Sequence, residues 1–250
     1  MRNSKVERIQ HELVTASLKL LHTVRFVDKV TTVSKYPPFL SQELYIHGSE
    51  GAQYDAPKTL PLTVDIGCGG GYSLKPLIAM GYPCIGVDLD LSSLQQTKID
   101  LLSPKFRNHL RSKAISVNIQ PDLDTISTSP LRNKLNALSP AADVVRWDLR
   151  RGLPFKQNSF DLAISISFLQ WLFYGNPKDQ LDRFFATLKS VLCPNGRAIL
   201  QFYPQNRKQL EEAVERAMPY FRGVVLGDYP HLDRGRKLFL ILFPFHPQEV

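Results

Sequence analysis

A glycine-rich segment, residues 64–72 (V-D-I-G-C-G-G-G-Y), carries the clearest chemical signal in the sequence. An apolar strand enters this segment at Val64 and a helix is predicted to leave it, so backbone N–H groups at the helix start should face a ligand. Glycine is needed where a ligand approaches the backbone too closely for a side chain, or where φ is positive. The segment therefore predicts a ligand-binding loop at the carboxyl end of a strand.

Two acidic residues accompany this loop. Asp65 directly precedes the glycines, where a pyrophosphate would meet a like charge and a ligand with an ammonium and a sulfonium would be attracted. A dinucleotide fingerprint would need Gly or Ala three residues after Gly69, and Tyr72 stands there. Asp88 ends the next apolar run, where its carboxylate can accept hydrogen bonds from both hydroxyls of a ribose. The loop and Asp88 together favour a nucleoside with a cationic end over NAD.

The elements that must position these residues alternate between strand and helix. Short apolar runs predict seven strands, the last two of which could pair antiparallel, at 62–66, 84–87, 142–145, 160–166, 197–202, 223–226 and 237–243. Helical spacing predicts helices at 4–21, 73–80, 91–102, 177–192 and 205–218. This alternation is typical of helices on both faces of a mostly parallel sheet. We expect a doubly wound, Rossmann-like α/β fold with a seven-stranded sheet and an added N-terminal helix.

The composition limits the class of protein. The formal charge of +8, from 31 Lys and Arg against 23 Asp and Glu, favours a polyanionic partner such as nucleic acid. The longest nearly apolar run, 238–245, is too short to span a membrane, and the first twenty residues contain no secretory core. Three cysteines without a C-x-x-C pair and six histidines without ligand spacing predict no disulfide and no metal site. We expect a reducing compartment and no membrane partner.

Two segments interrupt the alternation of strands and helices. Residues 34–61 contain four prolines and predict an irregular connection after the N-terminal helix. Residues 103–141 contain four more prolines. Residues 103–120 include several basic residues and no acidic residue. So long a connection is either functional or disordered, which leaves a surface insertion and an RNA-gripping element as alternatives. We expect a single domain over 1–250, with the helix and irregular connection in 1–61 and an insertion at 103–141.

The glycine loop followed by Asp88 resembles the class I S-adenosylmethionine-dependent methyltransferases. Further motifs make the resemblance more specific: W-D-L at 147–149, G-L-P-F at 152–155, S-F-D-L-A-I-S-I-S-F-L-Q-W-L at 159–172 and Q-F-Y-P-Q-N at 201–206. These are similar to motifs of the eukaryotic 18S rRNA (guanine-N7) methyltransferases of ribosome biogenesis. The resemblance implies an enzyme that uses S-adenosyl-L-methionine to methylate N7 of a guanine in small-subunit rRNA, and a nuclear location.

The same resemblance assigns roles to residues of this chain. The cofactor would be held by the glycine loop and by residues at the strand ends: Asp65, Gly67, Cys68, Gly69, Gly71, Asp88, Leu89, Asp148, Leu149 and Ser165. The guanine would be held by aromatic and amide side chains: Phe168, Gln170, Trp171 and Tyr203. For Trp171, a place in the core remains an equal alternative, because most tryptophans are packing residues. No catalytic acid or base is expected, since guanine N7 has a free lone pair and loses no proton.

The resemblance also implies a protein partner, a small zinc-binding methyltransferase activator docked along the third strand. That strand, 143–147, is expected at an edge of the sheet, where its unpaired backbone could add a strand from another chain. Two other functions stay open on the sequence alone. One is a methyltransferase with a small-molecule acceptor, because the glycine loop fits either acceptor, and the other is a pre-ribosome assembly factor with weak or no methylation.

Overall fold

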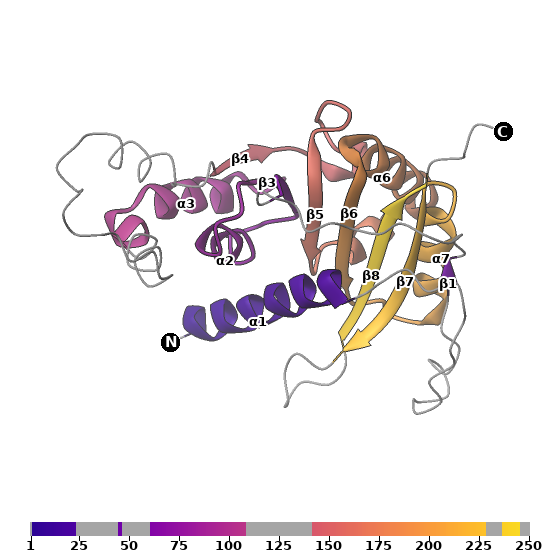
Figure 1. The fold of residues 1–250 in the computed structure, drawn as a ribbon, viewed down its shortest axis with the longest axis horizontal. Helices are drawn as coiled ribbons and strands as arrows, with labels where there is room; N and C mark the ends of the chain where they lie inside the picture. The colour runs from indigo at the N-terminus through magenta and orange to yellow at the C-terminus, as the bar shows by residue number, and fades with distance from the viewer. Residues whose placement is uncertain (1, 24–44, 47–60, 109–141, 229–236, 246–250) are drawn as a thin grey trace, which may run out of the picture.

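The computed structural model of the protein is built around one large β-sheet (Figure 1). It describes residues 2–23, 45–46, 61–108, 142–228 and 237–245. The strands are β1 (Tyr45–Ile46), β2 (Thr63–Ile66), β3 (Cys84–Asp88), β4 (Ala142–Arg146), β5 (Phe160–Ile166), β6 (Leu192–Phe202), β7 (Phe221–Asp228) and β8 (Lys237–Pro244). Their order across the sheet is β1-β7-β8-β6-β5-β2-β3-β4.

Most of the sheet is parallel. The strands from β6 through β5, β2 and β3 to β4 run in one direction, and β8 lies antiparallel between β6 and β7. Helices follow the strands along the chain: α2 (Leu74–Ala79), α3 (Leu91–Leu102), α6 (Pro177–Val191) and α7 (Arg207–Ala217), with α1 (Arg2–Thr23) before them. The doubly wound, mostly parallel α/β fold predicted from the sequence is therefore confirmed.

Local sequence signals explain where these helices begin. The side chain of Asp90 accepts a hydrogen bond from Ser92 N (3.1 Å) at the start of α3. Asn206 accepts one from Gln209 N (3.0 Å) at the start of α7. Short polar side chains at these positions satisfy backbone donors that a helix cannot pair internally.

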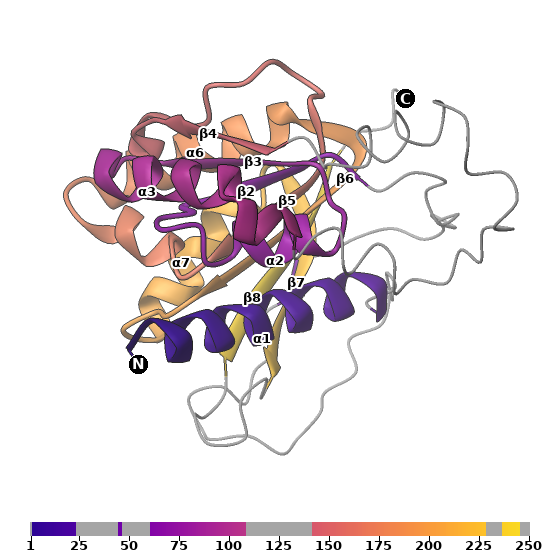
Figure 2. The same cartoon turned by 90° about the vertical axis from the view of Figure 1, so that its left-hand side faces the viewer.

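Helices cover both faces of the sheet (Figures 1 and 2). On one face, Leu13 of α1 and Leu77 of α2 pack in one buried cluster with Ile164 of β5. On the other, Phe184 of α6 packs in a second cluster with Ala163, the neighbour of Ile164 on β5. Successive side chains of a strand point to opposite faces, so a strand covered on both sides is apolar at nearly every position. No helix in the described residues is both long and apolar enough to cross a membrane.

The sheet differs from the prediction at its far edge, because it has one strand more than the seven expected. The extra strand, β1, lies within the segment predicted to be irregular and pairs antiparallel with β7, with Tyr45 opposite Val224. A strand of two residues has no periodicity of its own, and only its distant pairing partner defines it. In addition, β6 begins five residues before the predicted start. This early part contains Pro194 and Gly196, which are unfavourable in strands, and its register with β5 shifts, so no apolar pattern predicts it.

The predicted insertion at 103–141 begins as helix. Residues 104–108 are helical, and Ser103 Oγ accepts a hydrogen bond from Phe106 N (3.2 Å), which caps this turn. Residues 109–141 lie outside the described residues, as do most of those predicted to form the irregular connection. The choice between a surface insertion and an RNA-gripping element therefore stays open.

Candidate functional site

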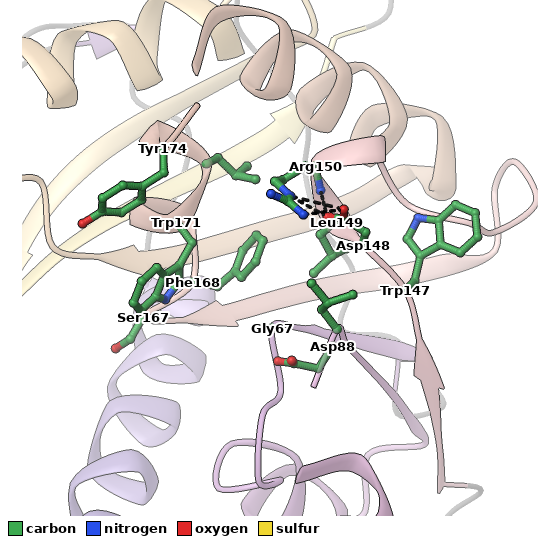
Figure 3. A pocket seen from close by; sticks show the side chains of 12 residues that line it. Gly67, Asp88, Trp147, Asp148, Leu149, Arg150, Ser167, Phe168, Trp171 and Tyr174 are labelled. Carbon is green, nitrogen blue, oxygen red and sulfur yellow. Dashed lines mark hydrogen bonds and ion pairs between the residues drawn. The ribbon is translucent and has the colours of Figure 1, made fainter. Parts of the chain in front are cut away.

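A pocket with a volume of about 420 Å³ lies at the carboxyl ends of the parallel strands (Figure 3). Its lining comes from four connections: Gly67, Asp88, Leu89, Trp147, Asp148, Leu149, Arg150, Ser167, Phe168, Trp171, Leu172 and Tyr174. Strand β2 pairs with β3 on one side and β5 on the other, so the order of strands reverses here. Ligands of open α/β sheets bind at such reversal points, and pockets of this size hold cofactors.

The glycine loop uses its own amides to hold its shape. Gly67 N and Cys68 N both donate to the carbonyl oxygen of Val87 (2.8 and 3.1 Å). Gly69 N donates to Asp88 Oδ2 (2.8 Å), and Gly71 N donates to the carbonyl oxygen of Cys68 (2.8 Å). These four amides are therefore used within the protein and are not free to bind a ligand. The expectation for the N–H groups at the start of the helix concerns other amides and stays a prediction.

Close approach explains the glycines. Gly67 has a φ of +73°, and a Cβ there would lie 2.5 Å from the Cβ of Phe168, which lines the pocket. Gly71 has a φ of +71°, and a Cβ there would lie 2.6 Å from Cγ2 of Thr97 on α3. Both positions combine a backbone conformation that side chains rarely adopt with no room for a side chain. Any other residue at position 67 would displace Phe168 from the pocket.

Asp65 is a buried carboxyl with an unused oxygen. The residue is completely buried, its Oδ2 accepts a hydrogen bond from Ser73 Oγ (2.7 Å), and its Oδ1 has no hydrogen-bond partner. Burial raises the pKa of Asp65 to about 7, the negative charge of Asp88 adds to the increase, and the bond from Ser73 opposes it. A buried acceptor without a partner is costly, and a positively charged ligand would offset that cost.

Asp88 joins the loop to the pocket. Its Oδ2 accepts the bond from Gly69 N and its Oδ1 accepts one from Asp90 N (2.9 Å), while the partly exposed side chain lines the pocket. A carboxylate has about four acceptor positions, so two bonds leave capacity for a ligand's hydroxyls. The position predicted for ribose binding therefore fits a ribose.

The opposite wall carries an ion pair that the sequence did not reveal. Nε and Nη2 of Arg150 lie 2.9 and 2.8 Å from the two carboxylate oxygens of Asp148 (Figure 3). The hydrogen bonds from Arg150 lower the pKa of Asp148. Leu149 beside them is buried and Leu89 is exposed, so this wall offers apolar contacts next to a closed ion pair. Such a wall suits the apolar face of a flat base.

Aromatic rings form the remaining side of the pocket. They follow β5 in the 3₁₀ helix η4 (Leu169–Phe173) and at its two ends. Trp171 and Tyr174 are 59% and 56% exposed, and their ring centroids lie 5.8 Å apart. The alternative that Trp171 belongs to the core is therefore wrong. Figure 3 shows both rings on the side of the pocket away from Trp147, with Phe168 between them and Asp148.

Comparisons with known proteins show what this chain is similar to. A family model described as a methyltransferase domain matches residues 101–200. A solved SAM-dependent methyltransferase from Methanosarcina mazei shares the fold with a TM-score of 0.50 at 16% identity, covering 76% of this chain and 95% of that one. Among curated proteins, the probable 18S rRNA (guanine-N(7))-methyltransferase of Dictyostelium discoideum is 32% identical over 188 residues, covering 73% of this chain and 52% of that protein.

The 18S rRNA (guanine-N(7))-methyltransferase of Bos taurus is also 32% identical, over 186 residues that cover 72% of this chain and 53% of that protein. Over nearly three quarters of its length, the chain is therefore similar to curated 18S rRNA (guanine-N(7))-methyltransferases. The chain spans about half the length of the curated relatives it matches.

Two residues expected to bind the cofactor lie elsewhere. Ser165 is fully buried within the sheet, where its Oγ donates to the carbonyl oxygen of Ile66 (3.0 Å), because it lies inside β5, which ends only at Ile166. The serine that lines the pocket is Ser167, which follows the strand with a φ of +60°. Cys68 is buried against Gly86, where a Cβ would lie 2.7 Å from its Sγ, and burial raises the pKa of its thiol. Both side chains are packing residues.

Gln170 also differs from its expected role. Its Nε2 donates to the carbonyl oxygen of Ser167 (2.6 Å), and its Oε1 accepts from Tyr203 N (3.4 Å). The predicted role was a contact with the edge of guanine. In the structure, the two hydrogen bonds of this amide join the turn after β5 to the turn after β6. Ser167 Oγ also bonds to Oε1 of buried Gln201 on β6 (3.0 Å). Gln170 is therefore a positioning residue.

The remaining predicted residues divide between the pocket and its surroundings. Gly67, Asp88, Leu89, Asp148, Leu149, Phe168 and Trp171 line the pocket together, whereas Asp65, Gly69 and Gly71 are not among its lining residues. Tyr203 is exposed beyond the lining, at the end of β6. Five lining residues were not predicted from the sequence: Trp147, Arg150, Ser167, Leu172 and Tyr174. Trp147 directly precedes the predicted Asp148. Tyr174 follows Trp171 by three residues, which places the rings of Trp171 and Tyr174 on one side of a 3₁₀ turn. That spacing could have revealed Tyr174.

Proposed function

We propose that this protein is an enzyme that transfers the methyl group of S-adenosyl-L-methionine to N7 of a guanine in small-subunit (18S) rRNA during ribosome biogenesis. The observation that carries the proposal is one continuous pocket with two unlike ends. One end has the glycine loop and Asp88, and the other has Phe168 and the exposed ring of Trp171. The first end fits a nucleoside cofactor, and the second fits an unstacked base. The similarity to curated 18S rRNA (guanine-N(7))-methyltransferases supports this acceptor.

The residues fit the cofactor as follows. Asp88 would bind the ribose hydroxyls, and the wall of Leu89, Asp148 and Leu149 would hold the adenine. The unpaired Oδ1 of Asp65 supports a cationic aminoacyl end near the loop. When bound, S-adenosyl-L-methionine supplies an already activated methyl group. The protein's part is then to bind, align and exclude water.

Alignment is what this pocket offers to the reaction. Guanine N7 has a free lone pair, so no side chain has to remove a proton from the acceptor. Holding two reactants in the right geometry can supply about 7–11 kcal/mol of a barrier. Phe168 is kept in place by its contact with the loop at Gly67, and Gln170 fixes the turn that carries Trp171. These residues would hold the base against the methyl group.

We also propose a small zinc-binding activator protein as partner, docked on β4. In the described sheet β4 pairs with β3 alone, and Ala142 and Asp143 are exposed. Helix α3, which packs beside β4, exposes Ile99 (62%) and Leu102 (56%). An open strand edge beside exposed apolar side chains is a favourable surface for strand addition. A nuclear location would follow from the role in ribosome biogenesis.

The experiment is to map methylated nucleosides in 18S rRNA by mass spectrometry, with the gene present, deleted, and replaced by an Asp88→Ala variant. We expect 7-methylguanosine at one site to disappear in the deletion and in the variant. Purified protein, co-expressed with its activator, should restore it on rRNA from the deletion strain. Methylation of a small molecule in place of RNA would contradict the proposal. Normal growth of the Asp88→Ala strain beside a defective deletion strain would indicate an assembly factor instead.

A further inference from the structure

Three aromatic side chains form an exposed group at one end of the sheet. Trp171 and Tyr174 follow β5, and Tyr203 follows β6, the neighbouring strand (42% exposed). They include every aromatic side chain among the described residues that is more than about a third exposed. Exposed apolar groups that gather at one place mark interaction sites, whereas scattered ones need no explanation.

The group is held in place from the protein side. Tyr203 N donates to Gln170 Oε1 (3.4 Å), which joins its turn to the turn that carries Trp171. Gln205 Nε2 lies 3.4 Å from the hydroxyl of Tyr174, and Gln180 Nε2 donates to the carbonyl oxygen of Tyr174 (2.9 Å). Turns that are fixed before binding lose less entropy when a partner arrives.

The rings are spaced for separate bases. The ring planes of Trp171 and Tyr174 make an angle of 32°, and their centroids are 5.8 Å apart. Neighbouring bases in a duplex are stacked about 3.4 Å apart. Bases that lie on these two rings would therefore be spread wider than in a helix, as in unpaired RNA.

Positive charge accompanies the aromatic group. Lys237 Nζ lies 5.2 Å from the centre of the Tyr203 ring. Arg150 also lines the pocket that Trp171 and Tyr174 line, where it is paired with Asp148. Cations beside aromatic rings are typical of surfaces that stack bases and hold the backbone phosphates of single-stranded nucleic acid.

We propose that Tyr174 and Tyr203 form a second base-binding subsite, which stacks the unpaired nucleotides flanking the guanine held at Trp171. The inference rests on the proposed function and adds to it the state of the RNA: the target must be single-stranded on both sides of the guanine. The enzyme would then select an accessible loop through its flanking bases as well as through the guanine itself.

The test measures binding of a labelled RNA of nine nucleotides, uridines around one central guanine, by fluorescence anisotropy at fixed salt. Tyr174→Leu and Tyr203→Leu remove the aromatic face, whereas Tyr174→Phe and Tyr203→Phe keep it. Met218→Ala, at an exposed side chain directly after α7, is the remote control. The full chain is used with its co-expressed activator, and calorimetry checks binding of S-adenosylmethionine in each variant.

We expect each Leu variant to bind the RNA roughly tenfold more weakly, and the Phe variants and the control to bind like the wild type. An RNA with abasic sites on both sides of the guanine should bind the wild type and the Leu variants equally. The inference is overturned if the Leu variants bind the intact RNA as tightly as the wild type, or if a duplex binds as well as the single strand. Failure of the proposed function would show differently, as an absence of rRNA methylation by the wild-type complex.

Discussion

Asp88 is the residue on which cofactor binding should depend most. We expect Asp88→Ala to weaken binding of S-adenosylmethionine by more than tenfold, about 1.4 kcal/mol or more, because hydrogen bonds to a charged acceptor contribute ~1.5–3 kcal/mol. The variant also loses the bond from Gly69 N that holds the loop. Calorimetry gives the affinity directly.

Asp90→Ala is the matched control for Asp88→Ala. Asp90 follows the same strand, yet its side chain caps α3 through Ser92 and Ser93. This control should lose some thermal stability and keep its affinity for the cofactor. Unchanged affinity in Asp88→Ala, or tight binding of NAD by the wild type, would contradict the assignment.

Asp65 predicts an unusual dependence on pH. The pKa of Asp65 is about 7 in the folded protein, against an ordinary value of 3.8. The unfolded chain therefore releases this proton at lower pH than the folded chain, so the carboxyl destabilises the fold increasingly as pH rises from about 4 to 7. At pH 8, Asp65→Asn should increase the free energy of unfolding of the ligand-free protein by on the order of a few kcal/mol, and so raise its melting temperature. At pH 4 the substitution should change the melting temperature little.

The affinity for the cofactor should depend on the protonation of the same carboxyl group. If the carboxylate attracts a cationic end, the wild type must release a proton to bind below pH 7. Its affinity for S-adenosylmethionine should then fall as the pH drops below 7, by up to about tenfold per pH unit. Asp65→Asn should bind weakly at every pH. A wild-type affinity that is constant between pH 5.5 and 8 would exclude this role of Asp65.

Trp171 can be tested by its separate effects on stability and on RNA. Because its side chain is largely exposed, Trp171→Ala should lose little stability, whereas truncation of a core tryptophan costs about 3–5 kcal/mol. Binding of RNA or of the transition state should weaken by about 1–3 kcal/mol. One thermal melt and one methylation assay on the same variant decide the matter. A large fall in melting temperature would argue against a substrate contact.

At the scale of elements, the pair of β4 and α3 predicts a partner. We expect the protein to be poorly soluble alone and to form a one-to-one complex with a co-expressed zinc-binding activator. Ile99→Asp should reduce recovery of that complex at least tenfold, because it places a charge on an apolar surface that the partner would bury. Affinity purification followed by size-exclusion chromatography measures the recovery.

Met218→Asp is the control for the partner surface. Met218 is also an exposed apolar side chain, but it follows α7, which covers the opposite face of the sheet from α3. The complex should survive this change. A protein that is soluble, stable and fully active without any partner would contradict the proposed interface.

At the scale of the whole molecule, the net charge of +8 predicts a difference between the two ligands. Contacts with phosphates release counterions, so RNA affinity should fall by roughly tenfold or more when salt rises from 50 to 200 mM. Affinity for S-adenosylmethionine, a small ligand in a pocket, should change far less. Equal salt dependence of the two affinities would favour a small-molecule acceptor over RNA.

The sequence by itself determined most of the elements and the position of the glycine loop. Strand β5 and helix α3 have the predicted bounds, because an apolar run and a helical spacing record which faces of an element are buried. Gly67 and Asp88 lie at strand ends beside the pocket, as the residue types allowed there indicated, and their role in binding stays a prediction. These signals are local, and each lies within a few residues.

Only the tertiary structure decided which atoms are already in use. The bonds of Ser165 to Ile66 and of Gln170 to Tyr203 join residues far apart in the chain. The exposure of Trp171 likewise depends on what packs around it, and β1 exists only through its pairing with β7. A side chain's type states which bonds it can make, whereas its partners depend on the packing of distant segments, which no local pattern records.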